Sequence, residues 1–188
     1  VRTTGRGAIG VFGIELDENN DEVIGMLCVS KKDVTKHILV VSEKGLGKRT
    51  PFLEKLEETA TEEEKLKAVK IAGEDGTEEL YQLSYRITNR GGKGVKTINI
   101  SEKTGGLVGL LAVEESDDLM ITCRSGLTIR MGVKDIREAG RATQGVKLIN
   151  LEGGDSIAAI ARIEEQEVAG EDDAEAAGVI DLNPAPEA

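Results

Sequence analysis

Basic residues recur beside glycines at fixed places in this sequence. Three arginines each stand four residues before a glycine that opens an apolar run: Arg6, Arg90 and Arg141. Cationic side chains attract phosphate, and neighbouring glycines let the backbone approach a phosphate closely and donate N–H groups to it. Modest contacts of this kind, repeated along an arc, suit the sugar–phosphate backbone of a nucleic acid and need no recognition of its bases.

Other basic residues occupy related positions in the sequence. Each could equally sit in an ordinary solvent-exposed turn, and the shared position favours function most clearly for the three arginines above as a set. The candidates for phosphate contact are Arg2, Arg6, Arg86, Arg90, Lys93 and Arg141 in the segments that lead into the apolar runs, Lys96 and Lys147 within those runs, and Lys48, Arg49 and Arg130 further along.

No set of residues indicates catalysis, a metal or a cofactor bound to this chain. The only histidine, His37, has no cysteine or carboxylate partner at ligand spacing. Cys28 and Cys123 do not form a CxxC pair, and we expect both to be small buried residues in a reducing compartment. The glycine-rich segments lack the pattern of a nucleotide-binding loop. Two Phe and two Tyr are too few to stack on unpaired bases, which favours duplex over single-stranded partners.

An internal repeat organises most of the chain. Three runs align without gaps, at residues 10–16, 94–100 and 145–151, and each begins with Gly-Val. A second apolar run follows each of them, and in the first two units a third run and a short basic strand complete the unit. The second runs are residues 23–29, 107–113 and 157–163; the third are 37–41 and 118–122; the basic strands are 44–50 and 125–131.

The repeat predicts an all-β fold. Four short strands in a unit of 51 residues, measured from Gly94 to Gly145, are typical of propeller-like blades of antiparallel strands. Twenty-three glycines against three prolines supply the tight turns, and the core must be aliphatic because tryptophan is absent. Apolar residues out of phase with strict alternation indicate sheets covered on both faces. We expect two complete four-strand sets and two strands of a third, about two and a half blades.

The charge of −11 is confined to two appendages. The tail from Glu164 holds nine acidic residues and no Lys or Arg, and the segment 54–80 holds ten acidic residues and four lysines. The remainder has 20 basic and 16 acidic residues. We expect a partial β-domain over 1–163, a charged helical insertion near 54–80 with Thr61 and Glu64 as a capping box, and a disordered acidic tail over 164–188.

Several motifs resemble the C-terminal domain of the DNA gyrase A subunit. They are Leu-Gly-Lys-Arg-Thr at 46–50, Tyr-Arg-Ile-Thr-Asn-Arg at 85–90, Lys-Gly-Val at 93–95 and Gly-Arg-Ala-Thr-Gln-Gly-Val at 140–146. The resemblance covers nearly all of 1–163 and implies a β-pinwheel, a propeller-like ring whose blades exchange strands and whose basic rim bends DNA. Residues 90–94 also resemble the end of the gyrase box, but Asn89 replaces its first arginine, and the box itself is expected upstream of Val1.

The resemblance implies that the domain wraps double-stranded DNA with a positive crossover. Such wrapping supports ATP-dependent negative supercoiling by a type II topoisomerase, in an A2B2 holoenzyme built from the gyrase A and B subunits. The catalytic tyrosine, the ATP site and Mg²⁺ would belong to the rest of that enzyme, so Tyr81 and Tyr85 are expected only to pack or cap strands. The expected location is the bacterial cytoplasm at the nucleoid, with no membrane contact.

Two alternatives remain open at this stage, and the tail adds a hypothesis. The first alternative is the C-terminal domain of the topoisomerase IV A subunit, which has related blades and weaker wrapping. The second is a propeller that serves only protein interaction, which predicts no salt-dependent binding to DNA. The acidic tail could act as a tethered polyanion that competes with DNA for the basic rim, or as a passive solubilising segment.

Overall fold

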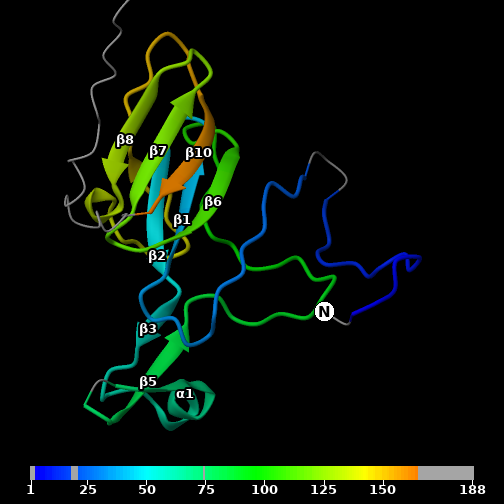
Figure 1. Ribbon diagram of the computed structural model, residues 1–188, viewed down its shortest axis with the longest axis vertical. Helices are drawn as coiled ribbons and strands as arrows, with labels where there is room; N and C mark the ends of the chain where they lie inside the picture. The colour runs from blue at the N-terminus through cyan, green and yellow to red at the C-terminus, as the bar shows by residue number, and fades with distance from the viewer. Residues whose placement is uncertain (1–2, 18–20, 74, 165–188) are drawn as a thin grey trace, which may run out of the picture.

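The computed structural model describes residues 3–17, 21–73 and 75–164 (Figure 1). The prediction of a disordered tail over 164–188 therefore lies, after Glu164, outside the described residues, and so does Arg2. The elements in chain order are β1 (His37–Ser42), β2 (Leu46–Pro51), β3 (Leu53–Lys55), α1 (Glu62–Lys67), β4 (Val69–Ala72), β5 (Glu78–Leu83), β6 (Leu107–Val113), β7 (Asp118–Cys123), β8 (Thr128–Gly132), the 3₁₀ turn η1 (Val133–Asp135), β9 (Val146–Lys147) and β10 (Ile157–Ile163).

The largest sheet is built from three different units of the repeat. Its strand order is β6-β1-β2-β9, and every pairing is antiparallel. The central hairpin β1–β2 comes from the first unit, whereas β6 is the second run of the second unit and β9 is part of the first run of the third unit. The hairpin of one unit is thus flanked on both sides by strands of the next two units.

The second sheet follows the same rule. Its order is β10-β7-β8, so the hairpin of the second unit carries the second run of the third unit on the edge of β7. Strands are therefore exchanged between units, as the resemblance to a β-pinwheel implied. Residues 23–29 and 94–100 form no strand and residues 10–16 make only an isolated bridge from Ile14 to Gly92, although all three were predicted to be strands, because no hairpin within the described ranges pairs with them.

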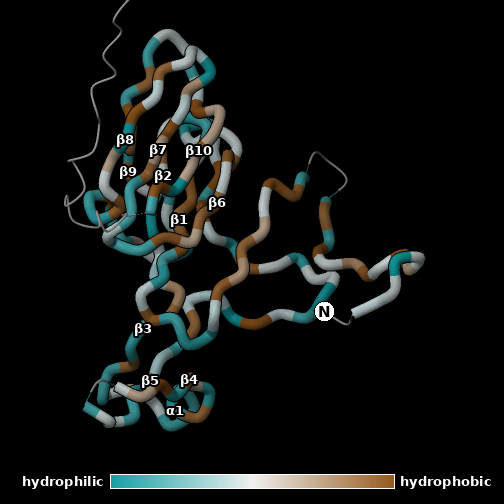
Figure 2. The backbone as a smooth tube through the Cα atoms, in the orientation of Figure 1, coloured by the Kyte–Doolittle hydropathy of each residue, from teal (hydrophilic) through white to brown (hydrophobic). Residues whose placement is uncertain are grey.

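The two sheets pack face to face over an aliphatic core. Leu39 and Val41 of β1 and Val113 of β6 meet Ile121 of β7 and Ile157 of β10, all of them almost fully buried. The opposite face of β1 packs a second, smaller cluster that includes Ile38 and Val40. Every residue of β1 is consequently buried, so this central strand is covered on both faces as predicted, whereas β8 and β10 of the second sheet keep exposed residues. Figure 2 shows the hydrophobic colour concentrated along these strands.

The charged insertion forms a small unit of its own at the far end of the molecule from the packed sheets (Figure 1). Its three antiparallel strands have the order β3-β5-β4, and α1 lies beside them. Thr61 and Glu64 form the predicted capping box: the Thr61 hydroxyl accepts from the Glu64 amide and a Glu64 carboxylate oxygen accepts from the Thr61 amide. The three strands were not predicted, since alternation there is short and interrupted by charge.

The aligned glycines of the repeat share one backbone conformation. Gly10, Gly94 and Gly145 have φ of 90°, 79° and 82°, a left-handed region that other residues rarely adopt. At Gly145 a Cβ atom would also lie 2.5 Å from the carbonyl oxygen of Gly47, because β9 approaches β2 closely there. The repeat therefore has a structural cause in the turn that opens each run. No helix in the described ranges is long and apolar enough to span a membrane.

Candidate nucleic-acid interface

The segments that lead into the first run of each unit (residues 5–9, 89–93 and 140–144) are here called leads, and the second and third of them lie beside the first run of the preceding unit. The amide of Glu15 donates to the carbonyl of Gly92 at 3.1 Å, and the amide of Asn99 donates to the carbonyl of Thr143 at 3.2 Å. In the alignment of the repeat Glu15 corresponds to Asn99, and Gly92 corresponds to Thr143. The same bond is therefore made twice, one unit apart, and it fixes the second and third leads in equivalent places.

This shared geometry places the lead arginines in register. Arg90 and Arg141 each precede the bonded carbonyl by two residues, and Arg6 has the same position in the first lead. Each lead then turns at its aligned glycine into the next run. A repeated backbone contact therefore underlies the register of Arg90 and Arg141 that the sequence predicts. For Arg6 the register rests on the sequence alignment alone.

Most of the predicted cations in the leads and first runs are available to a ligand. Their side chains have no carboxylate partner within the ranges that the structure describes; Lys96 does donate a hydrogen bond to the Asn99 side chain at 2.8 Å. An exposed cation without an acidic neighbour keeps its full attraction for phosphate. The exposed members of this set are Arg6, Arg86, Arg90, Lys93, Lys96 and Lys147.

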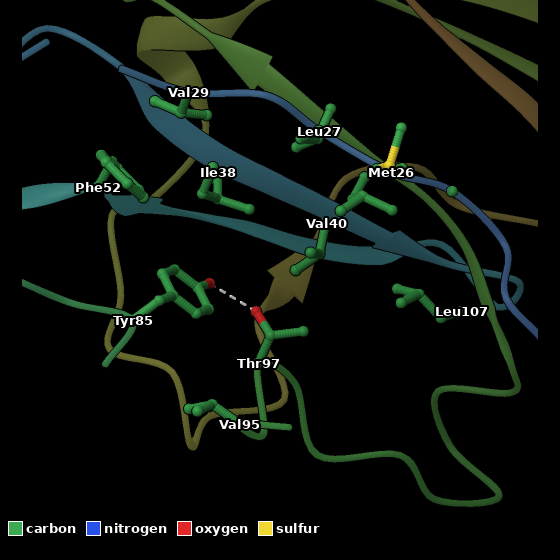
Figure 3. A pocket seen from close by; sticks show the side chains of 12 residues that line it. Met26, Leu27, Val29, Ile38, Val40, Phe52, Tyr85, Val95, Thr97 and Leu107 are labelled. Carbon is green, nitrogen blue, oxygen red and sulfur yellow. Dashed lines mark hydrogen bonds between the residues drawn. The ribbon is translucent and has the colours of Figure 1, made fainter. Parts of the chain in front are cut away.

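Arg141 is held differently from the exposed cations. It is half-buried, and its guanidinium carbon lies 5.9 Å from the centre of the Tyr85 ring, within the range of a cation–π contact. The Tyr85 hydroxyl is fixed in turn by a 2.6 Å hydrogen bond with the Thr97 hydroxyl (Figure 3). Tyr85 was expected to pack or cap a strand, and its role beneath Arg141 was not foreseen because residues 85 and 141 are remote in sequence.

Lys48 is not on the exposed rim, contrary to its place among the sequence candidates. Its side chain is fully buried, and its ammonium group donates to the carbonyl oxygens of Gly140 and Arg141. Burial, and next to it the charge of Arg141, lowers the pKa of Lys48 from 10.5 to about 8. The residue binds the third lead from within, and no phosphate can reach it in this conformation.

The two arginines of the last strands are engaged in ion pairs. Arg49 is buried, donates from Nε to the carbonyl of Ile136 at 2.8 Å and pairs with Glu115 at 2.5 Å. Arg130, at the corresponding position of the second unit, is exposed but pairs with Asp118 at 2.6 Å. The partner of Arg130 lies on the adjacent strand β7, whereas Glu115, the partner of Arg49, comes from a remote part of the sequence whose proximity depends on the fold.

An apolar groove lies on the face of the largest sheet that points away from the second sheet (Figure 3). It has a volume of about 440 Å³ and is lined by residues of 25–29 and 95–97, by β1 and β6, and by Phe52 and Tyr85. Two of its sides come from the second run of the first unit and the first run of the second unit, and the corresponding runs of the next two units, β6 and β9, hold the β1–β2 hairpin between them. Among the side chains that line it, all of them in the described ranges, one pair is hydrogen-bonded, Tyr85 with Thr97.

The remaining chemically active side chains have structural surroundings. His37 is nearly buried at the start of β1, and its Nε2 lies 3.1 Å from Glu138. Cys123 is buried as predicted, and burial raises the pKa of its thiol. Cys28 is exposed, which corrects the expectation: its neighbours Leu27 and Val29 pack against the second cluster and Cys28 does not. Within the described ranges, no three His, Cys, Asp or Glu side chains are grouped to hold a metal ion.

Comparison with known proteins gives both a family and related folds. The family described as DNA gyrase C-terminal domain, beta-propeller, matches residues 1–30, 36–54, 84–114 and 117–164. The DNA gyrase A subunit of Staphylococcus epidermidis is 36% identical over 167 residues, and that of Staphylococcus aureus is 38% identical over 165 residues. These matches cover 89% and 88% of this chain but only 15% of each relative, so the chain spans a small part of their length.

Two solved structures share the fold. The DNA gyrase A C-terminal domain superposes with a TM-score of 0.54 at 23% identity, over 86% of this chain and 44% of that one. The C-terminal domain of DNA topoisomerase IV gives 0.57 at 18% identity, over 82% and 38%. The family match omits residues 55–83, the insertion built on β3, α1, β4 and β5. On the repeat, the exchanged strands and the family match together, the chain belongs to the family of DNA gyrase C-terminal domains.

Proposed function

We propose that this chain binds the sugar–phosphate backbone of double-stranded DNA along its leads and forms part of the wrapping surface of a gyrase A subunit. The observation that carries the proposal is the repeated backbone bond, Glu15 to Gly92 and Asn99 to Thr143. Each bond fixes a lead against the first run of the preceding unit, so that the second and third leads occupy equivalent places and their cations can meet phosphates at separate points along one duplex. A curved duplex is held by many such modest contacts rather than by one strong contact.

The distribution of charge supports the proposal. The lead cations have no carboxylate partner within the described ranges, whereas Arg49 and Arg130 are neutralised by Glu115 and Asp118. The acidic insertion stands at the far end of the molecule from the packed sheets (Figure 1), and several of its acids pair with its own lysines, as Glu79 does with Lys55. The leads therefore keep their positive potential although the whole chain is acidic.

The enzyme to which this surface contributes is a type IIA topoisomerase. In it, wrapping with a positive crossover presents a DNA segment to the gate and directs ATP-driven strand passage toward negative supercoils. The catalytic tyrosine, ATP and Mg²⁺ belong to other parts of an A2B2 assembly with the B subunit, located in the cytoplasm at the nucleoid. In this chain the Tyr81 hydroxyl donates to Glu79 at 2.7 Å and Tyr85 is hydrogen-bonded to Thr97 at 2.6 Å.

The alternative parent enzyme, topoisomerase IV, shares the fold to a similar degree. The relatives that reach 36–38% identity over nearly the whole chain are gyrase A subunits, and this favours gyrase. A propeller used only for protein interaction is distinguished from both because it predicts no salt-dependent binding to DNA.

The test is a titration of a fluorescent 40-base-pair duplex with this chain at several KCl concentrations. We expect the logarithm of the association constant to fall with the logarithm of salt with a slope steeper than about −3, since each phosphate contact contributes about −0.9. Single-stranded DNA of the same length should bind more weakly. A slope near zero would contradict the proposal, and so would binding of this chain to an uncharged protein as strongly as to the duplex.

A further inference from the structure

We infer that Lys48 is the positioning residue for the phosphate contact of Arg141: from inside the fold, its charged ammonium group holds the third lead in the place where DNA meets it. The inference rests on the proposed function, since it concerns the same rim. It assigns to a buried lysine a part in binding a ligand that the lysine does not touch.

The third lead is fastened to β2 by an almost continuous set of contacts. The Thr50 hydroxyl donates to the carbonyl of Ala139 at 2.8 Å, and the amide of Ala139 donates to the carbonyl of Arg49 at 2.9 Å. The Lys48 ammonium group completes the series with bonds to the carbonyls of Gly140 and Arg141, the latter at 2.7 Å. Lys48 is therefore the residue of β2 that contacts the lead at Arg141 itself, through the backbone carbonyl of that residue.

The side chain of Arg141 is fixed on its other side by an aromatic platform. Its guanidinium lies over the ring of Tyr85, which Thr97 holds in place. No carboxylate within the described ranges pairs with this guanidinium. Two cationic groups are thus held close together without an acid between them, and such an arrangement is relieved when an anion binds.

The ionisation of Lys48 supports the geometric argument. Burial and the charge of Arg141 lower its pKa to about 8, so Lys48 is mostly charged at pH 7 and mostly neutral at pH 9. The other charged or titratable groups on the elements packed against β2 are His37 on β1, Arg137 and Glu138 after η1, Lys147 on β9 and Tyr85 beneath Arg141. Glu138 lies within hydrogen-bond distance of His37 at 3.1 Å, and Arg141 is the charged group that acts on the pKa of Lys48.

Binding of a phosphate at Arg141 must then favour the charged form of Lys48. Since such coupling is reciprocal, the charged form must also favour the phosphate. When Lys48 loses its proton, its amine keeps two N–H groups, but its bonds to the carbonyls of Gly140 and Arg141 lose their charge assistance, and the lead is held less firmly. Affinity for DNA is therefore expected to fall as the pH passes through about 8.

The experiment is a double-mutant cycle on this chain with a fluorescent duplex at pH 7 and pH 9. Arg141→Ala should reduce the salt slope by about 0.9, and Lys48→Met should reduce it equally although it removes no exposed charge. The double variant should lose no more than either single one. Lys67→Met on α1, which removes an exposed lysine paired with Glu63, is the matched control and should leave the slope unchanged.

The pH arms separate positioning from mere packing. The wild-type chain should bind several-fold more weakly at pH 9 than at pH 7, whereas the Arg141→Ala chain should show a flatter profile. If Lys48→Met does not fold, the titration midpoint of Lys48, followed by NMR of its labelled ε-carbon, decides: it should rise on adding duplex to the wild-type chain and stay in place in Arg141→Ala. Additive losses or an unmoved midpoint overturn this inference alone; absence of salt-dependent binding by the wild type overturns the proposed function as well.

Discussion

The amide of Asn99 donates to the carbonyl of Thr143 at 3.2 Å, and this bond joins the first run of one unit to the lead of the next. Its counterpart, from Glu15 to Gly92, lies one unit earlier. The two bonds turn a sequence repeat into a spatial repeat. They explain how a chain with a net charge of −11 can present a periodic row of cations.

The first prediction separates cations of the leads from cations of the last strands. Arg90→Ala and Arg141→Ala should each reduce the salt slope of duplex binding by about 0.9, and together by about twice that, because each removes one phosphate contact. Arg130→Ala removes an exposed arginine that is already paired with Asp118, and it should change the slope far less. Equal losses from all three variants would show that the ion pair does not distinguish them.

The second prediction concerns stability and the buried lysine. The pKa of Lys48 in the fold, about 8, lies below its ordinary value of 10.5, so between these values the unfolded chain binds more protons. The free energy of unfolding should therefore rise with pH in this window by about 3 kcal/mol at most from this residue. Below pH 8 the destabilising contribution is constant.

Urea unfolding gives the free energy of unfolding of the wild-type and Lys48→Met chains at pH 7.5 and at pH 10. The contribution of Lys48 is the change, between these pH values, in the difference between the two chains. The raised pKa values of Lys55 and Tyr81 act in both chains and cancel. The signs are opposite for the two properties of the wild type: stability from Lys48 rises with pH while affinity for DNA falls. If the difference in free energy of unfolding between the two chains does not change with pH, Lys48 has its ordinary pKa of 10.5 in the folded chain.

The third prediction tests the close approach at the start of β9. Gly145→Ala places a Cβ atom 2.5 Å from the carbonyl oxygen of Gly47 in a backbone with φ of 82°. We expect a loss of about 3 kcal/mol in the free energy of unfolding, from backbone strain and the clash together. Gly7→Ala, where a Cβ atom would meet nothing within 4 Å, is the control and should stay within about 0.5 kcal/mol of the wild type.

A comparable stability of the two alanine variants would mean that the turn at Gly145 can relax. In that case the recurrence of glycine at positions 10, 94 and 145 would need another cause than the fold of the run. Thermal or urea unfolding of the two variants side by side gives the answer.

The fourth prediction concerns the acidic tail. Deleting residues 164–188, which removes nine acidic residues, should raise affinity for duplex DNA at low salt, because a tethered polyanion competes for the lead cations. The effect should shrink as salt rises. A tail of equal length with its acids changed to Asn and Gln should behave like the deletion. Unchanged affinity in both variants would leave the tail a passive segment.

Much of the fold was visible in the sequence because it is local. The runs 107–113 and 157–163 coincide with β6 and β10, and the capping box at Thr61 marks the start of α1. The recurrent glycines were visible too, since a left-handed turn restricts the residue that can occupy it. Periodicity within a run, and the chemistry of a cap or a turn, are properties of a few neighbouring residues.

The exchange of strands and the state of each cation could not be obtained in this way. Gly47 on β2 pairs with Val146 on β9, almost a hundred residues away, and no local pattern encodes that choice. Lys48 and Lys96 follow glycine-containing stretches alike, yet the first is fully buried on carbonyl oxygens and the second is exposed. Which cation meets solvent depends on the neighbour that the fold supplies.

The most direct test of the account is the linking number of relaxed circular DNA that is nicked and religated in the presence of protein. The proteins are this chain, a longer gyrase A chain that adds the preceding units, and the longer chain carrying Arg6→Ala, Arg90→Ala and Arg141→Ala. We predict a positive shift with the longer chain that is largely lost in the triple variant, because the three leads hold the curved duplex. A shift of the same size with and without the three arginines would contradict the account.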